Sequence, residues 1–137
     1  MKLGQVLPAR ETLKHLAQCR NLAAVTSLRL ARYWRVIKPE LDAYETERVR
    51  LVYELGELVH VVDELGEREE IRVKPENEPE FKRQTAPMLE EEIELAVKPF
   101  DMLDFQKAGL SAEDIFALET AGLLNVDWDA IDAEETK

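Results

Sequence analysis

Four basic side chains in the first third of the chain are spaced in a way that suits phosphate binding. Arg29, Arg32, Arg35 and Lys38 follow one another at steps of three residues, so on a helix they form one band. Such a band can contact nucleic-acid phosphates, with an affinity that salt weakens. Two other interpretations stay open: acids of the same fold or of a neighbouring copy neutralise the band, or it is a solvated helix face.

Near its end the chain carries a tryptophan among acids. Trp128 lies between Asp127 and Asp129, with several apolar residues nearby. The carboxylates offer oxygens to a hard cation, but the stretch lacks the glycine and the final bidentate acid of an EF-hand loop, and we expect no metal. Because exposed aromatics anchor interfaces, the segment is typical of a docking motif for a partner or a sister subunit. Folding back onto the domain is the alternative.

A second dense group of carboxylates comes earlier, at Glu90–Glu92 and Glu94. Regularly spaced acids can imitate a phosphate backbone and occupy the nucleic-acid groove of another protein. The simpler interpretation is a solubilising surface.

No local arrangement typical of catalysis occurs. His15 and His60 are far apart, and each is expected to pack or to lie at the surface. Cys19 is the only cysteine, so an internal disulfide is excluded, and we expect it to be a small buried hydrophobe. The chain contains neither a glycine-rich dinucleotide motif nor a P-loop. We therefore predict no enzyme, no catalytic residues and no cofactor.

The charges are separated along the chain. Residues 1–38 hold 8 of the 18 Lys and Arg residues and 1 of the 29 acids, for a net charge of +7, and the remainder carries −18. Such an asymmetry indicates charged partners or self-complementation. The net charge of −11 argues against a dedicated DNA-binding protein, so we expect protein partners or self-association, with nucleic acid an unlikely partner.

The elements that position these residues are mainly helical. Leu30, Trp34, Ile37 and further apolar residues recur at steps of three, four or seven, which predicts one helix from about 24 to 55. Pro39 lies inside it and implies a kink or a break; because the apolar register continues through the proline, we favour a kinked helix. A helix of this length extends about 48 Å, more than a domain of this size can cover. We therefore expect a homo-oligomer, most simply a two-fold dimer.

Short β-branched stretches predict a small sheet. Residues 58–62 and 70–74 indicate a hairpin, and 92–97 alternates charged with apolar residues as a third strand would. A helix is expected over 81–89, and a Ser-Ala-Glu-Asp capping box at Ser111 opens another that ends before Gly122. The predicted fold is α+β and mainly α: a long kinked helix packed by shorter helices, with a three-stranded antiparallel sheet. We expect one domain over 1–122, with the hairpin as an insertion, and a mobile acidic tail over 123–137.

The order of these elements resembles a known group. The long helix runs into ELDAYETERVRLVYELGE, a DELGE turn follows, then VKPENEPEFKRQTAPMLEEEIEL and the closing LSAEDIFALE. Together they resemble small uncharacterised proteins encoded by tailed bacteriophages and prophages. The resemblance implies a non-enzymatic protein acting by protein–protein contact, as a virion or assembly accessory or as an inhibitor of a host system. It also implies a location in the host cytoplasm or the virion, which fits the lack of a signal-peptide h-region or a membrane-spanning stretch in the sequence.

Overall fold

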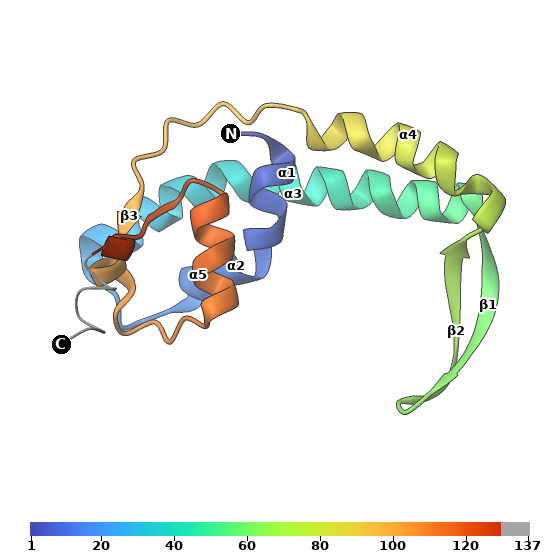
Figure 1. Cartoon of the computed structure of the whole chain (residues 1–137), viewed down its shortest axis with the longest axis horizontal. Coiled ribbons are helices and arrows are strands. Elements are labelled where there is room, and N and C mark those ends of the chain that lie inside the picture. The colour runs from blue at the N-terminus through green and yellow to red at the C-terminus, as the bar shows by residue number, and fades with distance from the viewer. Residues whose placement is uncertain (130–137) are drawn as a thin grey trace.

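The computed structural model describes residues 1–129, and one helix dominates it. Helix α3 runs from Ala24 to Leu55 and spans the length of the body (Figure 1). It continues through Pro39 without interruption, so the sequence-based range and the continuity across the proline are confirmed. Along the described chain the fold is mainly helical, with two small sheets.

Helix α3 turns one apolar face towards the rest of the chain. The buried side chains of this face recur at helical spacing: Thr26, Leu30, Tyr33, Ile37, Leu41, Tyr44 and Leu51. Trp34, which was expected in the same stripe, is only half-buried at its edge. Because the other elements of one chain cover this face, the length of α3 by itself does not require a second subunit. The length of α3 therefore gives no support for a dimer, and the expected homo-oligomer stays a prediction.

The N-terminal segment crosses the middle of α3. It consists of α1 (Leu3–Val6), the 3₁₀ turn η1 (Leu7–Ala9) and α2 (Arg10–Gln18). The side chains of Leu3, Val6, Leu13 and Leu16 are buried. Residues 1–3 also pair with 91–93: the Leu3 amide donates to the Glu91 carbonyl at 2.9 Å, and the Ile93 amide donates to the Met1 carbonyl at 2.7 Å.

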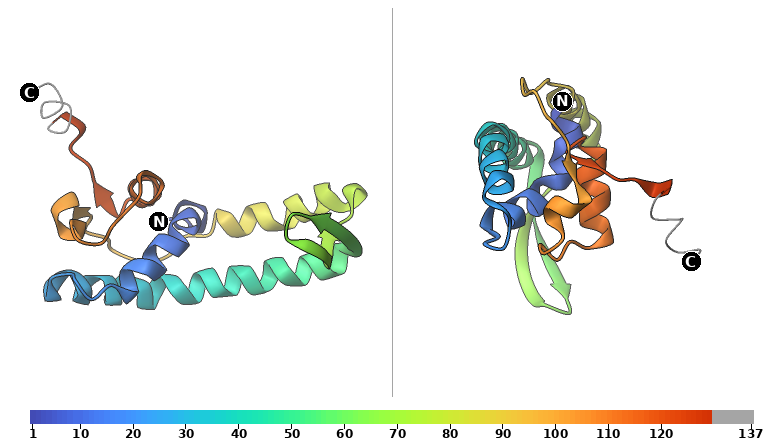
Figure 2. Two further views of the ribbon diagram at one scale, coloured as in Figure 1. Left: turned by 90° about the horizontal axis from the view of Figure 1, so that it is seen from below. Right: turned by 90° about the vertical axis from the view of Figure 1, so that its left-hand side faces the viewer.

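The C-terminal half of α3 is accompanied by α4 (Glu78–Leu89), which runs beside it in the opposite direction (Figures 1 and 2). Pro79 occupies the first turn of α4, as expected from its missing N–H. Asn77, in the 3₁₀ turn η2 (Pro75–Asn77), makes no side-chain cap. Its side-chain amide nitrogen donates instead to the Leu55 carbonyl at 3.0 Å, at the end of α3. Asn77 thereby ties the start of α4 to the end of α3.

The hairpin projects from this end of the molecule (Figure 1). Strand β1 (Gly56–Asp63) follows α3 directly and pairs antiparallel with β2 (Gly66–Val73). No third strand joins them within residues 1–129, so the expected three-stranded sheet is wrong. The segment 92–97 is extended but pairs at a single bridge, between Lys2 and Glu92, because buried Ile93 anchors it beside the N-terminus instead.

The C-terminal part closes the core over the N-terminal half of α3. Strand β3 (Phe100–Asp101) pairs parallel with β4 (Leu124–Asn125), and η3 (Met102–Phe105) and α5 (Ala112–Thr120) lie between them in sequence. The capping box is confirmed: the Asp114 amide donates to the Ser111 hydroxyl at 3.2 Å, and the Ser111 amide donates to the Asp114 carboxylate at 3.0 Å.

The folded part extends beyond the expected boundary at residue 122. Leu123 and Leu124 are 1% and 3% exposed and belong to the main core, so the start of the tail was placed too early. The rest of the expected tail, 130–137, lies outside the described residues. In the part that the structure describes, no helix combines the length and the apolar character needed to cross a membrane.

Candidate interaction surfaces

Arg29 does not lie free at the surface. Its guanidinium stacks over the ring of Phe100, 4.1 Å from the ring centroid, and donates a hydrogen bond to the Lys98 carbonyl. The Tyr33 hydroxyl holds the same peptide from α3: it donates to the Lys98 carbonyl at 3.1 Å and accepts from the Lys98 amide at 3.0 Å. Arg29 therefore fastens the extended segment before β3 to α3, and is not available for phosphate binding.

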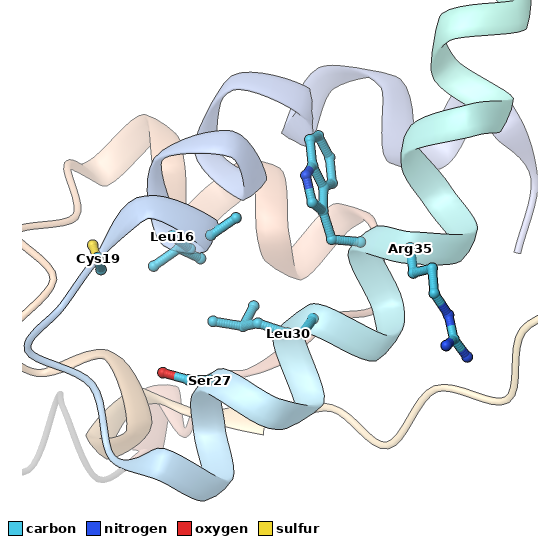
Figure 3. A pocket seen from close by; sticks show the side chains of 8 residues that line it. Leu16, Cys19, Ser27, Leu30 and Arg35 are labelled. Carbon is cyan, nitrogen blue, oxygen red and sulfur yellow. The ribbon is translucent and has the colours of Figure 1, made fainter.

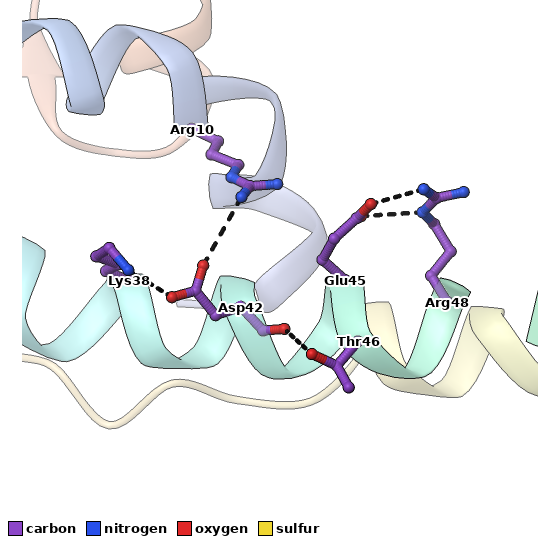
Figure 4. A network of polar contacts seen from close by, with 6 residues as sticks. All are labelled: Arg10, Lys38, Asp42, Glu45, Thr46 and Arg48. Carbon is purple, nitrogen blue, oxygen red and sulfur yellow. Dashed lines mark hydrogen bonds and ion pairs between the residues drawn. The ribbon is translucent and has the colours of Figure 1, made fainter. Parts of the chain in front are cut away.

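Lys38 is also occupied, by an acid on its own helix. Its ammonium lies 2.6 Å from the Asp42 carboxylate, and Arg10 of α2 lies 3.7 Å from the same group (Figure 4). The hydrogen bond from Lys38 lowers the pKa of Asp42 below its usual value, and the charges of Lys38 and Arg10 act in the same direction. These contacts agree with neutralisation of part of the basic band by acids of the same fold.

Arg32 and Arg35 are the two members of the band that point outwards. Both are exposed, and neither has an ion pair or hydrogen bond with another described residue. The predicted band of four cations is therefore reduced to two open ones. Two guanidinium groups are few for a surface that binds nucleic acid mainly through phosphates.

A groove lies between α2 and α3. One cavity of about 330 Å³ is lined by apolar side chains that include Leu16, Leu30 and Trp34, with Cys19 and Ser27 at its edge (Figure 3). A second cavity of about 300 Å³ shares Ala17 and Trp34 with the first. Its remaining lining is polar and mostly cationic: Arg10, Lys14, Gln18, Lys38 and Asp42. We call the two together the α2/α3 groove; its floor is apolar at one end and its walls are basic at the other.

The acidic segment at the end of the described chain lies on the side of the molecule opposite α3 (Figure 2). Trp128 is 53% exposed, and its indole N–H donates to the Glu119 carboxylate of α5 at 2.9 Å. Asp127 and Asp129, on either side, are exposed. The structure thus places Trp128 against α5 by one polar contact, while half of the ring stays open to solvent.

The hairpin carries apolar side chains that sequence reasoning did not single out. Leu58 and Val62 are 62% and 65% exposed on one face, and Leu65 at the tip is 89% exposed. The opposite face holds an ion-pair cluster in which Arg68 bridges Asp63 and Glu70. Leu58, His60 and Val62 alternate with Val59 and Val61 along β1 and could have indicated this face, but from the sequence we considered only a third strand that would pair with the hairpin. We call β1 and β2 with their turn the arm.

His15 and Cys19 lie together at the end of α2. The His15 Nε2 atom donates to the Ala108 carbonyl at 2.9 Å, and the Cys19 sulfur lies 3.7 Å from the same nitrogen. Because a carbonyl only accepts, the proton is on Nε2. Cys19 is half-buried, whereas a fully buried side chain was expected from the sequence. Within residues 1–129, no three His, Cys, Asp or Glu side chains are grouped so that they could hold a metal ion.

Comparison with known proteins adds no relative. No protein-family model matches the chain, and neither the curated proteins nor the solved structures contain a significant match.

Proposed function

We propose that this protein is a non-enzymatic contact protein that binds another protein through the arm. The observation that carries the proposal is the arm itself, a two-stranded sheet that stands off the body (Figures 1 and 2). It leaves the side chains of Leu58, Val62 and Leu65 open to solvent. A lone hairpin is marginally stable in water. Within residues 1–129 this one is held at its base, where the Lys74 amide donates to the Leu55 carbonyl at 3.1 Å.

The backbone of the arm supports the same proposal. Because β1 and β2 pair only with each other, each has an outer edge with N–H and C=O groups that no third strand occupies among the described residues. Such an edge accepts a strand from a partner, and main-chain hydrogen bonds supply the affinity. An apolar face beside the edge then supplies specificity.

The charge of the arm indicates the kind of partner. Residues 56–73 contain six acids and two arginines, a net charge of −4 that repels nucleic acid. A protein surface that is apolar and neutral to basic fits this chemistry. The role that accords best with these properties and with the phage resemblance is that of a virion or assembly accessory. An acidic inhibitor of a host defence or nucleic-acid-processing enzyme is the alternative.

Site-specific photo-cross-linking in the native host cell tests the proposal. A photoreactive amino acid replaces Leu65 at the tip of the arm, and a matched variant carries it at Ala86, an exposed position on α4. We expect discrete adducts from position 65 that are absent at position 86. The double substitution Leu58→Thr and Val62→Thr should remove them.

Sedimentation of the adducts separates the two roles. Adducts that sediment with particles support an accessory of assembly, and adducts in a host enzyme complex support the inhibitor. Equal cross-linking at positions 65 and 86 would contradict a role for the arm.

A further inference from the structure

We propose that the α2/α3 groove binds the acidic C-terminal segment of a second copy of this chain, residues 126–137. This inference concerns a surface and a partner different from those of the arm, and it stands or falls independently of the proposed function. It predicts self-association through a contact between the groove of one copy and residues 126–137 of another. This contact does not depend on the length of α3.

The groove offers two kinds of contact side by side. Leu16, Leu30 and Trp34 line the apolar end, where an aromatic or aliphatic anchor can be desolvated. At the other end Arg10, Lys14 and Lys38 outnumber the single acid, Asp42. Asp42 already bonds Lys38, whereas Lys14 is exposed and has no polar partner among the described residues. An occupant that combines an apolar anchor with several carboxylates matches both ends.

The C-terminal segment, residues 126–137, has this combination. Residues 127–137 include five acids and one lysine, a net charge of −4, and they carry Trp128 and Ile131 as apolar side chains. Trp128 is half-exposed and is held to Glu119 by one solvent-exposed hydrogen bond, so releasing the indole costs little because water replaces that bond. Opposite charges on groove and segment steer their encounter and fix the orientation.

The fold favours a second copy over the same chain as the source. The last described residues lead away from the body on the side opposite α3, in both views of Figure 2. To enter its own groove, the segment would have to turn back around α5 and α2. In trans no such path is needed, because a second copy can place its groove beside the segment. The twelve residues 126–137 reach up to roughly 40 Å when extended. Reciprocal exchange between two copies closes a two-fold dimer, whereas one-way exchange makes an open chain of subunits.

Trp34 provides a reporter at the site. In the full chain with Trp128→Phe, Trp34 is the only tryptophan, and its emission responds to an occupant of the groove. The titrant is a synthetic peptide of residues 126–137 that carries Trp128→Phe and therefore adds no indole emission, and a peptide with the same residues in scrambled order is the control. We expect a saturable change with the first peptide and none with the second. Equal responses to the two peptides, or no response to either, would overturn the proposal.

A charge variant tests the basic wall. Lys14→Glu should weaken peptide binding about fivefold to tenfold, because it replaces an attractive charge by a repulsive one. Lys82→Glu, on the exposed face of α4 away from the groove, makes the same charge change and should leave binding unaltered. Both residues lack polar partners among the described residues, so circular dichroism should confirm that both variants fold. An unchanged affinity in Lys14→Glu would overturn the proposed groove.

The mass of the full natural chain tests the source of the segment. Sedimentation equilibrium should show a mass that rises reversibly with concentration, and Trp128→Ala or Lys14→Glu should shift the chain to monomer. A strict monomer at all soluble concentrations would overturn binding in trans. If the peptide still bound, that result would assign the groove to the segment of the same chain.

Discussion

At the scale of single residues, the basic band divides into structural and open members. Arg29 and Arg32 are three residues apart on one helix, yet only Arg29 reaches Phe100 and the Lys98 carbonyl. Arg29→Ala should lower the free energy of unfolding by about 1–3 kcal/mol, because it removes a cation–π contact and a charge-assisted hydrogen bond. Arg32→Ala is the matched control and should stay within about 0.5 kcal/mol. Urea unfolding measures both, and equal effects would contradict the structural role of Arg29.

Thr12 and Asp114 form a contact whose strength depends on pH. The buried Thr12 hydroxyl of α2 donates to the Asp114 carboxylate of α5 at 2.7 Å, and this bond is the largest cause that lowers the pKa of Asp114 below 3.8. Because the folded pKa is depressed, the stabilisation is present above pH 3.8 and is lost as the pH falls below that value through the folded pKa. We expect Thr12→Val to cost about 1–2 kcal/mol near neutral pH.

The pH dependence distinguishes this bond from simple packing. In Thr12→Val the Asp114 pKa should rise towards 3.8, as measured by NMR titration of its carboxyl carbon. The difference in stability between the natural chain and the variant should therefore narrow in acid. A difference that stays constant down to the acid transition would indicate lost packing instead.

At the scale of elements, Gly56 joins α3 to the arm in a space too small for a side chain. A Cβ there would clash with the carbonyl oxygens of Val52 and Arg72, the latter at 2.6 Å. Both obstacles are backbone atoms, so Gly56→Ala should displace the arm and destabilise the fold by about 1–3 kcal/mol. At the turn, Gly66 has φ +108° and open space around it, so Gly66→Ala should cost roughly 1 kcal/mol from backbone strain alone.

Amide hydrogen exchange in the arm should distinguish the effects of Gly56→Ala and Gly66→Ala. Gly56→Ala should speed exchange along the whole of β1 and β2, because it disturbs the base of the hairpin. Gly66→Ala should act only near the turn. A Gly56→Ala protein that is as stable and as well protected as the natural chain would contradict the tight junction.

The elements also show where sequence patterns suffice. Helix α3 could be predicted because its apolar residues recur at helical spacing on both sides of Pro39. The spacing along a single helix face is local in sequence, so it is enough to identify a helix. The strand expected at 92–97 was wrong because alternation marks any extended segment with one buried side. Here Ile93 is buried beside the N-terminus, a contact between residues about 90 positions apart that no local pattern encodes.

At the scale of the whole molecule, the separation of charges was visible in the sequence, but the contacts that the charged side chains make were not. The sequence identifies the basic and acidic parts, yet only the fold shows that Arg29 is occupied, that Lys38 bonds Asp42, and that Lys14 borders an apolar groove. Likewise, only the fold shows that Leu65, at the tip of the arm, is 89% exposed. Candidate sites made by neighbours in space need the tertiary arrangement.

The core joins the N-terminal segment to residues 118–124, so the described part of the molecule should fold as one cooperative unit. Buried Leu118, Leu123 and Leu124 pack in the same cluster as Val6 and Leu16. A chain that ends at residue 110 removes three of these five side chains and should lose its cooperative urea transition. A chain that ends at residue 129 keeps the cluster whole and should retain the midpoint that the natural chain shows at concentrations where it is monomeric, even though it lacks most of the acidic segment. Far-ultraviolet circular dichroism across urea tests both; an unchanged transition in the shorter chain would mean that residues 1–110 contain a self-sufficient core.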